Sequence, residues 1–326
     1  MAGNGDKEKE EVLDFSHKIL LLREEIGKVV IGQENLIRDI LIALFGKGHI
    51  LLEGVPGLAK TLAVSSMSQV LNLSYQRIQF TPDLLPSDLI GARVFNPIKN
   101  DFYVKKGPIF SNFILADEIN RAPSKVQSAL LEAMAERQVS IGDETFFLEE
   151  PFIVLATQNP IEQDGTYNLP EAQLDRFLLK TIVDYPNEEE EISIMKENIS
   201  GNIYQKLTHI LSKEDIKKIQ ELISKIFVSD SLYEYIKDIS FYTRKKDIPL
   251  AKYIQFGVSP RASISLLKAS LVNAFLEGRD FILPEDIKEM AKPVLRHRII
   301  LSYEAIADNI KSDDIVEMIL KNIKIK

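Results

Sequence analysis

Five short segments, most of them apolar and each the length of a β-strand, are separated by helical segments in the first 186 residues of the chain. They lie at residues 49–53, 77–80, 113–117, 152–156 and 177–183. Strands that are apolar throughout are typical of a parallel sheet with helices on both faces. Beyond residue 186 the pattern is mostly helical. We therefore expect an α/β domain over residues 12–186, a smaller helical domain over 187–326, and a disordered tail over residues 1–11.

The composition is that of a globular protein and excludes several kinds of site. Of the 326 residues, 45% are hydrophobic and 27% are charged, which suits two packed domains. Because the chain has no cysteine, it has no disulfide, thiol nucleophile or cysteine-ligated metal. The polar start and the absence of a long uninterrupted apolar stretch predict a cytoplasmic protein without membrane insertion. The net charge of −8 argues weakly against binding to nucleic acid.

The segment after the first apolar run has the composition of a phosphate-binding loop. Residues 54–61 read GVPGLAKT and lie between an expected strand and an expected helix. Glycines let backbone N–H groups point at phosphate oxygens, while Lys60 can reach the β- and γ-phosphates and Thr61 can place a hydroxyl on Mg²⁺. Ala59 departs from the general pattern, which has glycine before the lysine, and it costs little if its φ is negative. The alternative interpretation is a Gly/Pro turn with a surface lysine.

Polar side chains follow two further apolar runs. Asp117 and Glu118 end the third run, where a parallel strand delivers its last side chains to the ligand edge of the sheet. Asp117 can hold Mg²⁺ through water, and Glu118 can polarise the attacking water. Asn159 follows the fourth run, and it either orients that water and senses the γ-phosphate or forms a turn before Pro160.

Five segments together resemble the MoxR family of AAA+ ATPases over about residues 16–325. They are GVPGLAKT at 54–61, DEINRAP at 117–123, ATQNP at 156–160, LPEAQLDRF at 169–177 and SPRA at 259–262. Alanine before the lysine is usual in that family. The resemblance implies an α/β AAA+ P-loop NTPase domain with a central parallel sheet, followed by a smaller all-helical lid domain. It also implies two cofactors, ATP and Mg²⁺.

The resemblance assigns roles to individual positions. Its catalytic residues are Glu118, Asn159 as sensor 1, Arg176 as an arginine finger for the ATP of the neighbouring subunit, and Arg261 as sensor 2, in cis or in trans. The metal-binding residues are Thr61 and Asp117. The expected nucleotide-binding residues are Ile31 and Gln33 near the adenine, together with Gly54, Val55, Pro56, Gly57, Leu58, Ala59, Lys60, Thr61 and Leu62 in and just after the loop.

The resemblance further implies a ring-forming homo-oligomer, a hexamer when ATP is bound, that remodels a client protein such as one with a von Willebrand A domain. Two insertions fall where the family has a helix-2 insert, at 83–107, and a hairpin, at 138–148. A nucleic-acid-dependent motor or loader is the alternative function, and a nucleotide-gated scaffold is a third. The negative net charge argues against the nucleic-acid motor. The intact acid pair argues against the scaffold, because it indicates that ATP is hydrolysed.

Two other groups of basic residues have open roles. Arg121 either contacts nucleotide across an interface or holds its own loop. Residues 296–298, Arg-His-Arg, either touch nucleotide or a neighbouring subunit or form a solvated helix end, and we favour the solvated end.

Overall fold

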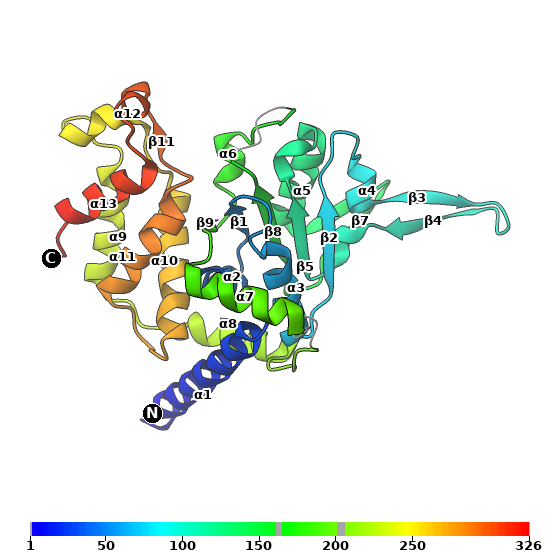
Figure 1. The fold of residues 1–326 in the computed structure, drawn as a ribbon, viewed down its shortest axis with the longest axis horizontal. Helices are drawn as coiled ribbons and strands as arrows, with labels where there is room; N and C mark the ends of the chain where they lie inside the picture. Colours follow the sequence, from blue (N-terminus) through cyan, green and yellow to red (C-terminus); the bar gives the residue numbers. More distant parts are fainter. Residues whose placement is uncertain (1, 161–164, 201–205, 326) are drawn as a thin grey trace. The chain divides into compact units, whose positions relative to one another are not determined.

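The computed structural model describes residues 2–160, 165–200 and 206–325, and its internal contacts divide the chain into two compact units. The larger unit comprises residues 21–176 and 181–216, and the smaller one comprises residues 1–20, 177–180 and 217–326. The sequence pattern changes near residue 186, but the boundary between the two units lies later in the chain, after residue 216. Residues 187–216 belong to the larger unit. Figure 1 shows the elements in sequence colours.

A five-stranded sheet has the strand order β2-β5-β8-β1-β9. Its pairs β2/β5, β5/β8 and β8/β1 are parallel. The strands are β1 (Ile50–Glu53), β2 (Tyr75–Gln79), β5 (Phe113–Asp117), β8 (Ile153–Gln158) and β9 (Leu179–Ile182). All five expected strands and the parallel sheet are thus confirmed. The central strands β1, β5 and β8 are buried along almost their whole length, which explains why they are apolar throughout.

Helices and short turns precede, connect or follow the strands of the sheet (Figure 1). They are α2 (Glu34–Phe45), α3 (Lys60–Val70), the 3₁₀ turns η1 (Pro108–Phe110) and η2 (Ile119–Arg121), α5 (Ser124–Glu136), α6 (Glu171–Leu174) and α7 (Glu188–Ser200).

The two insertions each form an antiparallel hairpin. After α4 (Pro86–Ile90), strands β3 (Gly91–Asn96) and β4 (Asp101–Lys106) pair along their full length and project from the unit (Figure 1). Strands β6 (Gln138–Ile141) and β7 (Glu144–Phe147) turn at Gly142 and Asp143, as the sequence predicts. An ion pair of 3.2 Å between Arg93 Nη1 and Asp143 Oδ2 joins the two hairpins.

The N-terminal segment differs from the expectation. The chain from Ala2 to Gly27 is one helix, α1, so the disordered tail predicted for residues 1–11 is wrong over residues 2–11, and residue 1 lies outside the described part. Lysine and glutamate, which made the segment look like a solvated tail, are also good helix formers. Glu8 and Glu11 form ion pairs of 2.8 and 3.1 Å with Lys225 and Lys218, which tie the helix to the smaller unit.

The C-terminal portion is mostly helical, as expected, and adds a two-stranded ribbon. Its elements are α8 (Lys213–Ile223), α9 (Asp230–Tyr242), η4 (Pro249–Tyr253), β10 (Ile254–Phe256), α10 (Pro260–Leu276), α11 (Pro284–Leu295), β11 (Ile300–Leu301), α12 (Tyr303–Ala307) and α13 (Ser312–Asn322). Across the described residues of the whole chain, every helix is too short or too polar to cross a lipid bilayer.

A buried histidine fastens the start of β1 to its neighbours. His49 Nδ1 accepts a hydrogen bond of 3.0 Å from the backbone N–H of Val154 in β8. Its Nε2 lies 3.1 Å from the carbonyl oxygen of Met134 in α5, so Nε2 carries the proton. Burial lowers the pKa of His49 to about 4, because the low dielectric disfavours the imidazolium.

This histidine predicts a pH dependence of stability. Between about pH 4 and the unfolded value near 6.5, the unfolded chain binds more protons at His49, so the unfolding free energy rises with pH. The full effect is about 3 kcal/mol, present above that window and lost as pH falls through it. Urea unfolding at several pH values should show a shallower rise for His49→Gln than for wild type. Equal slopes in the two proteins would contradict the buried neutral imidazole.

Candidate functional site

The loop between β1 and α3 has the backbone that a phosphate site requires. A side chain at Gly54 would bring its Cβ to 2.7 Å from the carbonyl oxygen of Val183, so only glycine fits there. Gly57 has a φ of +89°, a conformation that favours glycine. Lys60, the first residue of α3, donates a hydrogen bond of 2.6 Å from Nζ to the carbonyl oxygen of Gly54. The lysine thereby spans the loop at the N-terminus of the helix, where anions bind favourably.

Ala59 differs from the expectation of a negative φ. Its φ is 55° and its ψ is 15°, which is the left-handed helical region. For a residue with a Cβ this conformation costs roughly 1–2 kcal/mol relative to the right-handed one. The alanine at this position therefore stores strain where glycine would store none.

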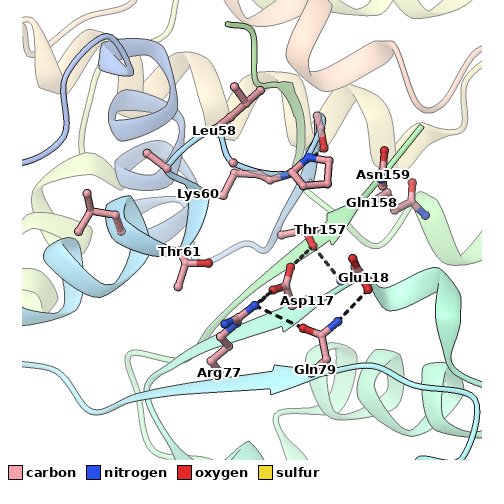
Figure 2. Close-up of a pocket in the computed structure, with 15 residues that line it drawn as sticks. Leu58, Lys60, Thr61, Arg77, Gln79, Asp117, Glu118, Thr157, Gln158 and Asn159 are labelled. Carbon is pink, nitrogen blue, oxygen red and sulfur yellow. Dashed lines mark hydrogen bonds and ion pairs between the residues drawn. The ribbon is translucent and has the colours of Figure 1, made fainter. Parts of the chain in front are cut away.

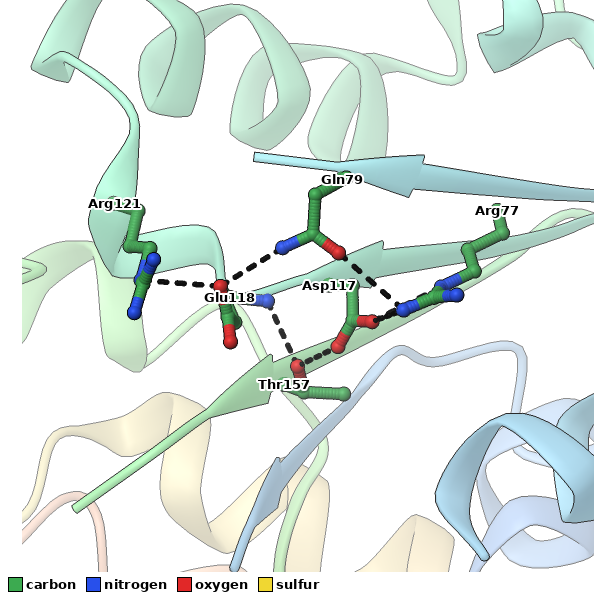
Figure 3. Close-up of polar contacts among 6 residues, drawn as sticks. All are labelled: Arg77, Gln79, Asp117, Glu118, Arg121 and Thr157. Carbon is green, nitrogen blue, oxygen red and sulfur yellow. Dashed lines mark hydrogen bonds and ion pairs between the residues drawn. The ribbon is translucent and has the colours of Figure 1, made fainter. Parts of the chain in front are cut away.

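Asp117 and Glu118 stand at the end of β5, and each carboxylate has several donors (Figure 3). Asp117 Oδ1 accepts a bond of 2.6 Å from Thr157 Oγ1, and Asp117 Oδ2 accepts a bond of 3.0 Å from Arg77 Nε. Thr157 Oγ1 also accepts a bond of 2.8 Å from the backbone N–H of Glu118. This threonine thus holds the two acids in a fixed relation.

Glu118 has two partners of its own and an unusual backbone. Its Oε2 accepts a bond of 2.8 Å from Gln79 Nε2 and lies 3.1 Å from Arg121 Nε. Arg121 therefore binds within its own loop, which was one of the two roles that the sequence left open. Glu118 has a φ of 56°, and strained backbone of this kind is common at functional sites.

The sequence did not point to Arg77, Gln79 or Thr157 as site residues. Arg77 and Gln79 lie two positions apart on the edge strand β2, so their side chains share a face. Gln79 pairs in register with Asp117, which brings this face to the acids. Alternating polar residues on a strand normally indicate a solvated face, and only the pairing of β2 with β5 reveals the contact.

A cavity of about 400 Å³ unites the loop and the acids (Figure 2). Its walls come from the loop after β1 and from α3, β2, β5 and β8. The lining residues are Gly54, Pro56, Gly57, Leu58, Ala59, Lys60, Thr61, Leu62, Arg77, Gln79, Asp117, Glu118, Thr157, Gln158 and Asn159. Val55, also expected to bind nucleotide, does not line it. Burial lowers the pKa of Lys60, while the negative charges of Asp117 and Glu118 oppose that shift. The ammonium is thus partly desolvated and faces the place where phosphates would lie.

A smaller apolar cavity adjoins the loop on the side expected for the adenine. Ile31 and Gln33 line it together with Leu58, Leu62 and Ile194. Gln33 is buried, and its Nε2 donates a bond of 3.2 Å to the carbonyl oxygen of Asp184. Because Leu58 and Leu62 line both cavities, one nucleotide could place its base in one and its phosphates in the other.

Comparisons with known proteins agree with this geometry. Residues 49–179 match the model of the ATPase family associated with various cellular activities, and residues 250–319 match an AAA lid domain. The chaperone MoxR1 of Mycobacterium tuberculosis is 46% identical over 92% of this chain and 80% of its own length. The protein MoxR of Methylorubrum extorquens is 30% identical over 88% of this chain and 89% of its own length. The chain belongs to the MoxR family of AAA+ ATPases.

A solved structure extends the match to the whole fold. The crystal structure of a suspected ATPase from Cytophaga hutchinsonii superposes with a TM-score of 0.92 at 50% identity, covering 98% of both chains. The AAA domain, the lid and the ATPase class predicted from the MoxR resemblance are thereby confirmed.

The three residues expected to act as sensors and arginine finger lie in different surroundings. Asn159 is buried and lines the main cavity just beyond β8. Arg176 is exposed outside the cavity lining, and its Nη1 donates a bond of 2.6 Å to the carbonyl oxygen of Leu131 in α5. Arg261 belongs to the smaller unit, in the first turn of α10, and its backbone N–H donates to Ser259 Oγ at 3.2 Å.

The strain at Ala59 can be measured. Replacing Ala59 with glycine should raise the unfolding free energy by about 1 kcal/mol, because the Cβ that disfavours a φ of 55° is removed. Ala135, exposed in α5, is the matched control, and its replacement with glycine should lower stability by about 1 kcal/mol. Urea unfolding without nucleotide measures both. Loss of stability in both variants would contradict the left-handed backbone at Ala59.

Proposed function

We propose that this chain binds ATP with Mg²⁺, hydrolyses the bond between the β- and γ-phosphates within a homo-oligomeric ring, and uses the energy to remodel a client protein. The observation that carries the proposal is the single cavity in which Lys60, Thr61, the two acids and Asn159 face one another. Phosphoryl transfer needs positioning and charge stabilisation more than covalent chemistry, and this set of groups supplies both.

The donor set fits the cofactors. The Thr61 hydroxyl and the Asp117 carboxylate are hard oxygen ligands, which Mg²⁺ prefers. When bound, Mg²⁺ would neutralise charge on the phosphate oxygens. Lys60 would bind the β- and γ-phosphates in place of its present acceptor, the carbonyl oxygen of Gly54. Glu118 would then polarise the attacking water, and Asn159 would orient it beside the γ-phosphate.

An exchange of partners is part of this mechanism. Arg77 now occupies Asp117 Oδ2, while Gln79 and Arg121 occupy Glu118 Oε2. Each of these side chains occupies a carboxylate oxygen that a metal ion or the attacking water would need. Binding of the nucleotide and metal must therefore compete with three side chains before hydrolysis begins.

The placement of Arg176 supports a ring. The residue is exposed and does not line the cavity of its own chain, as expected for a guanidinium that serves the ATP of a neighbouring subunit. A hexamer is the ring size that the MoxR resemblance implies. Arg261 would sense nucleotide from the lid, in cis or in trans.

A client protein is the proposed target because the relative in Mycobacterium tuberculosis is named a chaperone. A client with a von Willebrand A domain fits the family pattern, and the cytoplasm is the proposed compartment. The two hairpins, β3–β4 and β6–β7, are the insertions through which a client would be contacted. The net charge of −8 favours a protein target over nucleic acid.

Two variants separate nucleotide binding from turnover. Lys60→Ala should abolish ATP binding, because the phosphates lose their lysine. Glu118→Gln should keep binding but lower turnover about a hundredfold, because an amide cannot polarise the water. Glu132→Gln, exposed in α5, is a control that should match wild type. Calorimetric binding and steady-state phosphate release measure these effects, and undiminished hydrolysis in Glu118→Gln would refute its assigned role.

The arginine finger can be tested by mixing subunits. Arg176→Ala should bind ATP normally and lose turnover by about a thousandfold, because charge on the transferring phosphoryl group is left uncompensated. Lys60→Ala subunits have an intact Arg176 but no nucleotide. Mixing the two inactive variants should therefore restore part of the activity if the finger acts between subunits. No recovery at any mixing ratio would count against action in trans.

A further inference from the structure

The three residues after α11 bind backbone carbonyl groups immediately beyond the arginine finger. Arg298 Nη2 donates a bond of 2.6 Å to the carbonyl oxygen of Phe177, and its Nη1 donates one of 3.2 Å to that of Leu178. His297 Nε2 lies 3.2 Å from the Phe177 oxygen, and Arg296 Nη1 donates to the Lys180 oxygen at 3.2 Å. We call residues 296–298 the carbonyl clamp.

The clamp is not the solvated helix end that the sequence favoured. His297 is 8% exposed and Arg298 is 7% exposed. Burial lowers the pKa of His297 well below its usual value, so the ring is neutral, with Nε2 as the donor and Nδ1 without a hydrogen-bond partner. Buried backbone carbonyls need donors, and here side chains supply them.

The other ends of the clamp are anchored within the smaller unit. Arg298 also donates to Ser265 Oγ in α10 at 3.1 Å and to the carbonyl oxygen of Val294 in α11. Arg296 makes a two-pronged pair with Asp313 in α13, at 3.0 and 2.9 Å. A planar guanidinium with several donors can join helices to a chain segment in this way, whereas a lysine cannot.

The segment that the clamp holds is continuous with Arg176. Residues 177–180 group with the smaller unit, whereas Arg176 groups with the larger one, so the division falls on the peptide bond between Arg176 and Phe177. The Arg176 side chain is fixed on its other side by the carbonyl oxygen of Leu131. The residues that the clamp holds therefore follow Arg176 directly in the chain.

We propose that the carbonyl clamp is a positioning device for the arginine finger, so that the state of the lid sets the reach of Arg176 toward a neighbouring subunit. The proposal rests on the role of Arg176 given under the proposed function. The clamp binds backbone atoms of residues 177–180, and none of its three residues lines the main cavity. Its loss should therefore lower turnover while leaving ATP affinity unchanged.

Arg298→Lys tests the proposal, because lysine keeps the charge but lacks the fork that reaches two carbonyls. We expect kcat to fall about tenfold, as for a misplaced catalytic group, with ATP affinity unchanged. Arg279→Lys is the matched control, because Arg279 makes a two-pronged pair with Asp286 in the same unit but does not contact residues 177–180. It should keep the kcat of wild type. An unchanged kcat in Arg298→Lys would overturn the proposal.

Subunit mixing distinguishes positioning from a general structural role. An Arg298→Lys subunit should have a competent cavity and a misplaced finger, so mixing it with Lys60→Ala should raise activity above the sum of the two. Mixing it with Arg176→Ala should give no gain, because both lack a working finger. Gain in the second mixture, or none in the first, would overturn the clamp as a positioning device.

A double variant and a substitute variant complete the test. In an Arg176→Ala background, Arg298→Lys should cause no further fall in single-turnover rate, and an additive fall would overturn the proposal. If Arg176→Ala alone keeps wild-type turnover, the finger itself fails, and the clamp proposal fails with it. If Arg298→Lys does not fold by circular dichroism, Arg296→Gln replaces it in every arm, with the same outcomes expected.

Discussion

Parallel pairing of β1, β8 and β5 is the constraint on which the site depends. Parallel strands end at the same edge, so Glu53 pairs with Gln158, and Ala116, one residue before Asp117, pairs with Ala156. The phosphate loop, the acids and Asn159 are far apart in sequence, yet each follows the end of one of these strands. The apolar character of the strands is thus the indirect cause of the polar site, because burying them fixes which ends meet.

The carboxylates of Asp117 and Glu118 at this edge already have side-chain partners, so a bound nucleotide and metal ion would have to replace some of them. Thr157 binds both acids, which fixes their spacing without neutralising either one. Arg77 and Gln79 come from the exposed edge strand, so their contacts are partly screened by water and can be replaced at modest cost. A site arranged in this way keeps its carboxylates ordered before the ligand arrives and leaves the competing partners easy to displace.

The sequence predicted this architecture well where burial decides the residue type. The buried strands β1, β5 and β8 coincide with apolar runs, and the hairpin turn at Gly142 follows from turn chemistry. It failed where the decisive quantity is a pairing or a backbone angle. Arg77 and Gln79 become site residues only through the register with β5, and the positive φ of Ala59 is set by the loop as a whole. The charged residues at the N-terminus predict a solvated tail, whereas two of them form ion pairs with the smaller unit.

Residues 296–298 show the same limit in another form. A basic triplet at a helix end normally indicates solvent, and nothing in the local pattern distinguishes side chains that bind carbonyls 120 residues away. The contacts go to backbone oxygens of residues 177–180, so they require no acidic side chains in that segment. The sequence of the segment therefore does not reveal them. A device that grips the backbone also leaves the side chains of Phe177 and Leu178 free to pack in the core, where both are buried. One segment can therefore be bound through its backbone by residues 296–298 and still pack its side chains in the core.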